Sequence, residues 1–238
     1  ATGEEYRAKI EVPFFARYLK GKGDYTQAEA TVFESGSNQW RTFSAWPPKE
    51  AVTRSLYFGA NGLLSFSAPR TPGNDSFVSD PAHPVPYRNR PVESTYYPRG
   101  SGWPAWLTED QRFVHNRPDV LSWSTEPLAE DLVLAGDVTA RLLVSTTGQD
   151  ADWIVKLIDV YPEEHPANTR LGGFQLMVSN DVFRSRFRES LFPIIDRNPQ
   201  TWMPNIFEAK ESDFRAQTHR VWRTPTQASR VELQVVSP

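Results

Sequence analysis

The chain has 238 residues, of which 39% are hydrophobic and 13% aromatic, and it contains no cysteine. Its 26 basic and 29 acidic residues give a formal charge of −3, so no basic excess favours nucleic acid as a partner. No apolar run reaches the roughly 18 residues that span a bilayer, and no membrane partner is expected. Without cysteine, disulfides and thiolate–metal sites are excluded, whereas the compartment stays open.

The first 24 residues contain the one convincing helix of the chain, the segment EEYRAKIEVPFFARYLK at 4–20. Apolar residues recur in it at nearly helical spacing: Ile10, Phe14, Phe15, Tyr18 and Leu19. Gly21 ends the helix, and Pro13, which would cost about 3 kcal/mol in a helix interior, favours a start near Val12. Because the rest of the chain has strand patterns, we expect this apolar face to dock on another domain or to stay partly exposed.

Short strands are predicted on both sides of a proline-rich middle. The patterns typical of strands fall at 30–34, 40–44, 55–58, 63–67, 173–178 and 231–236. Between 69 and 127 many prolines exclude long strands, while abundant aromatic residues exclude disorder. We expect this middle to be an ordered meander packed against another part of the molecule.

The stretch 126–162 is predicted to form the centre of the fold. Apolar runs at 132–144 and 153–161 flank a polar turn at 146–150. The first run alternates apolar and polar residues, whereas the second is apolar on both sides. We therefore expect an antiparallel pair at the centre of a β-sandwich, with the second strand inside its sheet.

Several long segments carry a resemblance to a known family. They are SDPAHPVPY at 79–87, RPDVLSWSTEPLAEDLVLAG at 117–136, TTGQDADWIVKLIDVYP at 146–162 and DRNPQTWMPNIFEA at 196–209. On these segments the chain resembles the C-terminal β-domain of the α-amino-acid ester hydrolases. The wider group of these serine hydrolases includes cocaine esterases, glutaryl acylases and X-Pro dipeptidyl-peptidases.

The resemblance implies a fold and a parent protein. Residues 1–24 would be the last helix of an upstream α/β-hydrolase domain, and residues 25–238 a jelly-roll-like β-sandwich, so that the chain is mainly β. The parent would be a periplasmic or secreted serine hydrolase that acts on α-amino-acid esters, with acyl transfer to β-lactam nuclei as a further activity. Its upstream domain and other copies in a homo-oligomer are the implied partners. This portion would brace the catalytic domain and shape the mouth of the active site.

One junction departs from the family pattern. Relatives carry a further strand pair after a segment like FRSRFRES, which in this chain contains the basic residues Arg184, Arg186 and Arg188. In this chain Glu189 and Ser190 run directly into a segment like LFPIIDRNP. We interpret this as residues missing from the sequence, and we expect a discontinuity between Arg188 and Phe192.

The chain lacks the motif for serine hydrolysis. An α/β-hydrolase nucleophile needs the turn Gly-x-Ser-x-Gly, which does not occur, and Ser101 lies in the shorter Gly-Ser-Gly. In the resembling family the catalytic Ser, Asp and His all precede the helix matched at 12–23. No catalytic, cofactor-binding or metal-binding residue is therefore assigned, and no cofactor is expected.

Histidines and acidic residues are the remaining candidates for a site. The histidines, which lack a second ligand at metal spacing, are His83, His115, His165 and His219. Asp150 and Asp152 are interpreted as turn residues that bind backbone N–H groups, with calcium binding as the less favoured alternative. On an apolar strand, Asp159 is expected to pair with an arginine. Residues 196–199 (Asp-Arg-Asn-Pro) predict a polar turn, with substrate contact as the alternative.

Aromatic residues in the meander leave a second class of function open. Trp103 and Trp106 could stack on a sugar, which would make the chain a stand-alone jelly-roll binding module. Packing against a neighbouring domain is the commoner role of such residues. The alternatives differ in the expected surface: a flat aromatic platform for sugar binding, or an apolar patch beside the N-terminal helix for docking.

Overall fold

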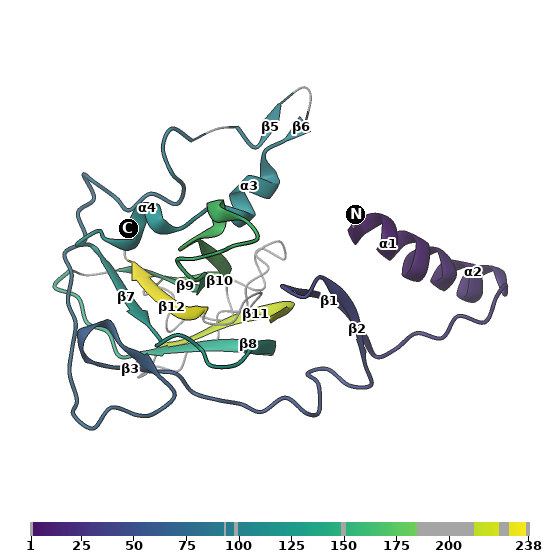
Figure 1. The fold of residues 1–238 in the computed structure, drawn as a ribbon, viewed down its shortest axis with the longest axis horizontal. Coiled ribbons are helices and arrows are strands. Elements are labelled where there is room, and N and C mark those ends of the chain that lie inside the picture. Colours follow the sequence, from purple (N-terminus) through teal and green to yellow (C-terminus); the bar gives the residue numbers. More distant parts are fainter. Residues whose placement is uncertain are drawn as a thin grey trace.

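In the part of the chain that the structure describes, two four-stranded sheets form the body of the protein (Figure 1). The computed structural model describes residues 2–92, 94–97, 100–148, 151–184, 212–223 and 229–236, and of residues 212–223 it describes the backbone alone. The predicted β-sandwich preceded by a helix is confirmed. The finer assignments, a jelly roll and a domain boundary after residue 24, stay predictions.

The first sheet has the strand order β2-β1-β11-β8. These strands are β2 (Gln39–Phe43), β1 (Ala30–Ser35), β11 (Ser212–Arg223) and β8 (Val133–Leu142). β1 pairs with β2 in antiparallel and with β11 in parallel orientation, and β11 pairs with β8 in antiparallel orientation. The strand at β11 was not predicted from the sequence.

The second sheet is antiparallel throughout, in the order β10-β9-β12-β7. Its strands are β10 (Gln175–Arg184), β9 (Asp152–Val160), β12 (Arg230–Val236) and β7 (Val120–Ser124). The prediction that β9 lies inside its sheet is confirmed, because it is hydrogen-bonded to β10 and β12.

The predicted pairing of the two central strands is wrong. β8 and β9 lie in different sheets, so the segment between them crosses from one layer of the sandwich to the other. The burial patterns give the physical reason. β8 alternates half-buried and exposed residues along most of its length, which suits the edge of a sheet, whereas β9 is buried on both faces, which suits the interior of a covered sheet.

The interior between the sheets is apolar. Its buried residues are Leu64, Trp123, Trp153, Val155, Leu157, Val231 and Val235, and alternate residues of β8 pack against them. On its outer face the second sheet is covered by the meander, where Val114 and Val120 form a second small core with Phe113 and Ile154. Burial on both faces explains why the sequence of β9 is apolar on both sides.

Short elements fill the meander and its flanks. The hairpins are β3 (Tyr57–Phe58) with β4 (Leu64–Ser65), and β5 (Tyr96–Tyr97) with β6 (Gly100–Ser101). The helical turns are η2 (Ala60–Gly62), α3 (Trp103–Thr108), α4 (Arg112–His115) and η3 (Thr169–Leu171). The expected ordered meander is therefore present, and it contains more helix than the proline content indicated.

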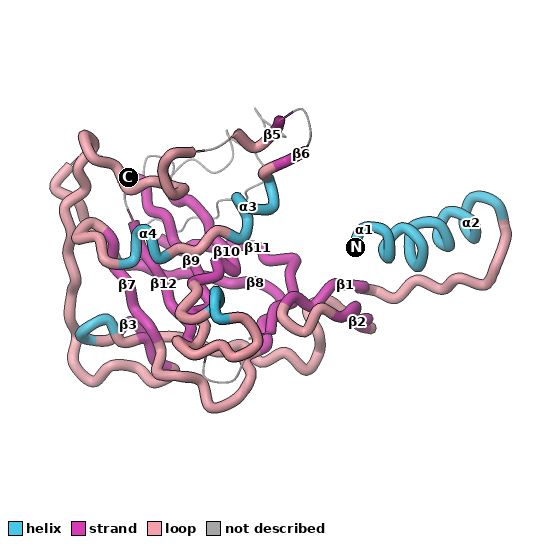
Figure 2. Tube along the Cα trace, turned by 45° about the horizontal axis from the view of Figure 1, so that its top comes forward, coloured by secondary structure: helices cyan, strands magenta, loops and turns pink. Residues whose placement is uncertain are grey.

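The N-terminal helix stands apart from the sandwich, as Figure 2 also shows. It consists of α1 (Thr2–Tyr6), a π-helical turn η1 (Arg7–Glu11) and α2 (Val12–Lys20). Helical backbone thus begins at Thr2 and not near Val12. The predicted start near Val12 assumed that Pro13 would prevent helix before it. Instead, Pro13 lies in the first turn of α2, directly after the wider π turn.

The helix ends as the sequence predicts. Gly21 adopts the left-handed conformation with φ 62°, and its N–H donates to the carbonyl of Arg17 at 3.1 Å. Among the described residues, no helix combines the length and the apolar character that crossing a membrane requires.

Candidate docking surface

The structure brings a serine, a carboxylate and a histidine together in an order that cannot make a nucleophile. Glu232 on β12 is 1% exposed, and it accepts hydrogen bonds from Ser124 Oγ at 2.9 Å and from His115 Nδ1 at 3.0 Å. A catalytic triad needs the histidine between the serine and the acid, so that the imidazole takes the hydroxyl proton. Here the acid lies between them. The cluster therefore ties α4 and β7 to β12.

Ser101 offers no alternative nucleophile. Its hydroxyl donates to the carbonyl of Thr95 at 3.1 Å and accepts from the N–H of Trp103 at 3.2 Å. Both partners are backbone groups, one just before β5 and one at the first residue of α3, and neither is a base. The hydroxyl thus holds the hairpin to the start of α3.

The acidic residues singled out in the sequence are not brought together as a metal site. Within the described part of the chain, no three His, Cys, Asp or Glu side chains converge in a way that could hold a metal ion. Asp152 lies on β9 opposite Arg184 of β10, and their side chains are 3.6 Å apart. Asp150 lies outside the described residues, as do residues 196–199 and the expected discontinuity between Arg188 and Phe192.

Asp159 does not have the predicted arginine partner among the described residues. It is 0% exposed on the core side of β9, and neither carboxylate oxygen has a well-formed hydrogen bond in the described structure. Burial raises the pKa of Asp159 to about 7, an effect that the neighbouring Ser229 hydroxyl only partly offsets. The alternation of the strand indicated burial but not the protonation state of the acid.

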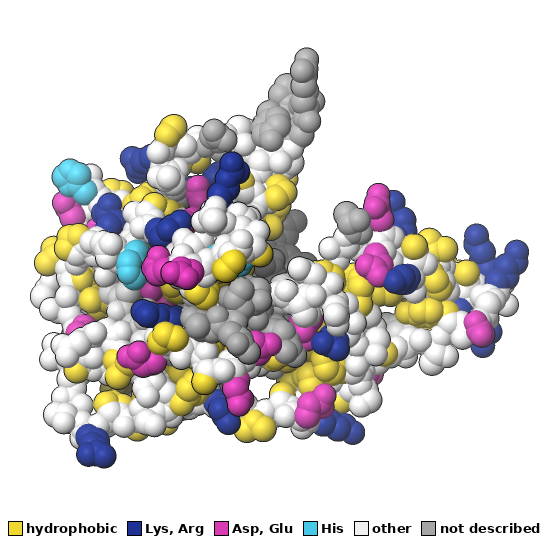
Figure 3. All heavy atoms as spheres, viewed as in Figure 1, with side chains coloured by type: hydrophobic (Ala, Val, Ile, Leu, Met, Phe, Trp, Pro, Cys, Tyr) yellow, Lys and Arg dark blue, Asp and Glu magenta, His cyan; other side chains and the backbone are white. Residues whose placement is uncertain are grey.

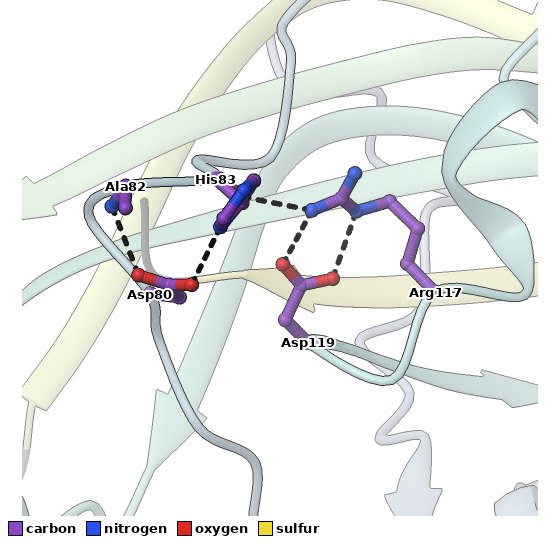
Figure 4. A network of polar contacts seen from close by, with 5 residues as sticks. All are labelled: Asp80, Ala82, His83, Arg117 and Asp119. Carbon is purple, nitrogen blue, oxygen red and sulfur yellow. Dashed lines mark hydrogen bonds and ion pairs between the residues drawn. The ribbon is translucent and has the colours of Figure 1, made fainter.

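Two segments that carry the resemblance meet at a polar network on the meander (Figure 4). The guanidinium of Arg117 binds both carboxylate oxygens of Asp119, at 2.8 and 2.6 Å, and donates to the carbonyl of His83 at 3.0 Å. The ring of His83 in turn binds Asp80 at 2.8 Å. Hydrogen bonding to Arg117 lowers the pKa of Asp119, so the Arg117–Asp119 pair is ionic at neutral pH. This network fixes loops and holds no reacting group.

The remaining histidines also have structural surroundings. His165 stacks on Tyr161 at a centroid distance of 6.0 Å, and its Nδ1 accepts from the N–H of Asn168. His219 lies on β11, of which only the backbone is described.

A buried lysine under the meander was missed by the sequence analysis. Lys156 projects from the outer face of β9, is 2% exposed, and donates to Gln111 Oε1 at 2.8 Å. The rings of Phe113 and Tyr87 lie within 6.0 Å of its ammonium group. Burial lowers the pKa of Lys156 to about 8. The available signal was a lysine in the middle of a strand that is apolar on both sides, between Val155 and Leu157.

The N-terminal helix presents an uncovered apolar face. None of its residues is buried, and Leu19 is 74% exposed. Phe14 packs on Phe15, Tyr18 and Tyr25, all of which belong to the helix or to the linker after it. The sandwich itself reaches the helix at Trp40, whose ring lies 6.1 Å from that of Tyr6. The predicted exposure of this face is confirmed.

The comparison with protein families identifies the chain. Residues 24–191 match the family described as the X-Pro dipeptidyl-peptidase C-terminal non-catalytic domain, and the chain belongs to this family. The predicted recognition is thus confirmed. The match ends at residue 191, at the junction where the sequence departs from the family pattern.

Solved structures and curated relatives extend the likeness beyond this match. An aminopeptidase from a marine sediment Thaumarchaeota archaeon is 40% identical with a TM-score of 0.84, and an α-amino acid ester hydrolase is 36% identical with a TM-score of 0.78. Each alignment covers 99% of this chain but only 37% and 38% of those proteins. A cocaine esterase from Rhodococcus sp. (strain MB1 Bresler) is 32% identical over 189 residues, which are 75% of this chain and 30% of the esterase.

Proposed function

We propose that this chain is the C-terminal domain of a serine hydrolase that acts on α-amino-acid esters, and that it braces the catalytic domain and forms part of the wall of the active-site mouth. The observation that carries the proposal is the uncovered apolar face of α1–α2. Exposed apolar surface costs roughly 25 cal/mol per Å² relative to burial, so burying this apolar face against a partner would be favourable. The relatives supply a candidate for it, since more than half of each lies outside the matched portion.

The names of two relatives support the proposed substrate class. These names, α-amino acid ester hydrolase and aminopeptidase, both imply cleavage of a bond beside an α-amino group. They support an aminoacyl substrate for the hydrolase that would contain this chain. Acyl transfer to β-lactam nuclei, a periplasmic or secreted location, and assembly into a homo-oligomer are further parts of the proposal.

The test uses the intact hydrolase that would contain this chain. We expect Tyr18→Ser and Leu19→Ser to lower the temperature at which the intact enzyme loses activity on phenylglycine methyl ester. The same changes should leave the unfolding of the 238-residue chain unaltered. The exposed Tyr57→Ser, on β3, is the matched control. Equal effects of all three changes in the intact enzyme would contradict docking through the helix.

The sugar-binding alternative has one observation in its favour, the exposure of Trp103. Trp106 does not extend it into a platform, because the guanidinium of Arg88 lies 4.6 Å from the centre of its ring and covers one face. Intrinsic fluorescence of the chain titrated with a panel of glycans separates the two functions: the proposal predicts no saturable change.

A further inference from the structure

A second exposed aromatic surface lies on the meander. We define the aromatic arm as helix α3 together with the side chains of Tyr87 and Arg88, which pack on Trp106 of this helix. Trp103 is 49% exposed and Tyr87 is 48% exposed, and both contact Trp106. Large aromatic side chains that stay exposed in a folded domain mark interaction surfaces more often than scattered aliphatic ones do.

The arm is held in place by a continuous ladder of contacts. The guanidinium of Arg88 binds the carboxylate of Glu109 through two hydrogen bonds of 2.9 and 3.2 Å, while its flat face covers Trp106. The carbonyl of Glu109 accepts from Gln111 Nε2 at 2.9 Å, and Gln111 binds the buried Lys156 of β9. Because the ladder begins in the core sheet, the exposed rings are preorganised and do not fold back onto the body.

The chemistry of the arm fits a protein surface. Arg88 is neutralised by Glu109, so the exposed part of the arm presents no net charge to an anionic ligand. Trp106 is covered by Arg88 and contacted by Trp103 and Tyr87, which leaves no open ring pair for stacking on a sugar. Tryptophan, tyrosine and arginine held in this way are the residues that dominate protein–protein contacts.

The position of the arm indicates the partner. In both ribbon views the arm lies above the sheets and the N-terminal helix lies to the right of it (Figures 1 and 2). The space-filling view shows yellow apolar side chains along the N-terminal helix (Figure 3). A body that packs on the apolar face of the helix would lie beside the arm as well. In the relatives, more than half of the length is available to form such a body.

We infer that the aromatic arm is a second docking surface for the catalytic domain, which is thus held between the helix and the arm. The inference rests on the proposed function, because the helix must join a catalytic domain for the arm to reach it. It adds a specific contact through Trp103 and Tyr87, and it makes Arg88 the positioning residue for that contact.

Hydroxyl-radical footprinting tests the two surfaces separately. The labelling of Trp103, Tyr87, Tyr18 and Phe66 is compared between the 238-residue chain and the intact hydrolase. We expect the two arm residues and Tyr18 to be labelled about fivefold more slowly in the intact protein, as burial at a contact requires. Phe66 is the control, because it is 41% exposed on the chain but belongs to neither surface.

Each pattern of protection has a defined meaning. Protection of Tyr18 without the arm residues would overturn the inference and leave the proposed function standing, and protection of neither would remove both. Arm protection that grows with protein concentration would assign the arm to a contact between copies and also overturn the inference.

As a second measurement, Trp103→Ala should speed thermal inactivation of the intact enzyme about tenfold. Phe66→Ala should not, and Trp103→Ala should leave the unfolding of the 238-residue chain nearly unchanged.

Discussion

Single residues set the pH dependence of this domain. Asp159, Lys156 and His115 differ in surroundings, and their pKa values are shifted for different reasons: desolvation for the first two, and a hydrogen bond to Glu232 for the third. The signs of these shifts determine how the stability of the fold responds to pH.

For Asp159 we expect stability to fall as the pH rises. Its pKa is raised from 3.8 to about 7 on folding, so the folded state binds the proton more tightly. The stabilisation of the folded state by proton binding to Asp159 is fully present below pH 3.8 and is lost as the pH rises through about 7. The loss amounts to at most about 4 kcal/mol. Urea unfolding followed by tryptophan fluorescence should show this slope in the native chain and not in Asp159→Asn. Asp152→Asn is the control, and parallel slopes for native and Asp159→Asn chains would contradict the assignment.

His115 should stabilise the fold in acid, and this stabilisation should be lost as the pH rises. The hydrogen bond to Glu232 raises its pKa above 6.5, so the ion pair is complete below pH 6.5 and is lost as the pH passes the raised value. We expect His115→Gln to lower the free energy of unfolding by about 1 kcal/mol at pH 5.5, because the ring is a third exposed, and by less at pH 8.5. A ring titration by NMR gives the pKa directly, and a value at or below 6.5 would refute the pairing.

The N-terminal helix and the central strand β9 differ in how far their apolar residues are buried. The helix is amphipathic but buries none of its residues, whereas β9 is buried on both faces, by the apolar core on one side and by the meander on the other. Apolar residues therefore matter to the stability of this chain in β9 and not in the helix. Because the meander covers the outer face of β9, a polar residue of the meander such as Gln111 can bind Lys156 of that strand.

Substitutions in these two elements should separate by magnitude. Ile158 is 0% exposed, so Ile158→Ala should cost about 2–5 kcal/mol of unfolding free energy. Phe15→Ala in α2 should cost less than about 0.5 kcal/mol in the same chain, as expected for a residue outside the core. Chemical denaturation of both variants measures the difference. A cost for Phe15→Ala comparable with that of Ile158→Ala would show that the helix packs on its own sandwich.

For the whole molecule, the described structure holds a scaffold and contact surfaces but no assembled triad. Ser124, Glu232 and His115 converge with the acid in the middle, and Ser101 binds backbone groups alone. Loss of the nucleophile in a triad enzyme removes roughly 10⁶-fold of the rate. We expect the 238-residue chain to hydrolyse phenylglycine methyl ester no faster than buffer does. Labelling of any serine by a fluorophosphonate probe would contradict this.

Much of the fold was available from the sequence because it depends on local patterns. Alternation along 132–144 and the doubly apolar run 153–161 report which faces are buried, and Gly21 reports where the helix must end. The absence of Gly-x-Ser-x-Gly excluded the nucleophile turn of α/β-hydrolases. The exposed apolar face of the helix was also predicted, since a lone amphipathic helix in a β chain has no second helix to cover it.

Pairing and charge were decided by the tertiary structure alone. Alternation shows that a strand has a buried face but not which strand lies beside it, so β8 and β9 were paired wrongly. The bond between His115 and Glu232 joins residues 117 positions apart, and that between Gln111 and Lys156 joins residues 45 apart. Such contacts follow from how the meander folds over the second sheet. Burial by that meander determines the pKa of Lys156, and packing between the two sheets determines that of Asp159.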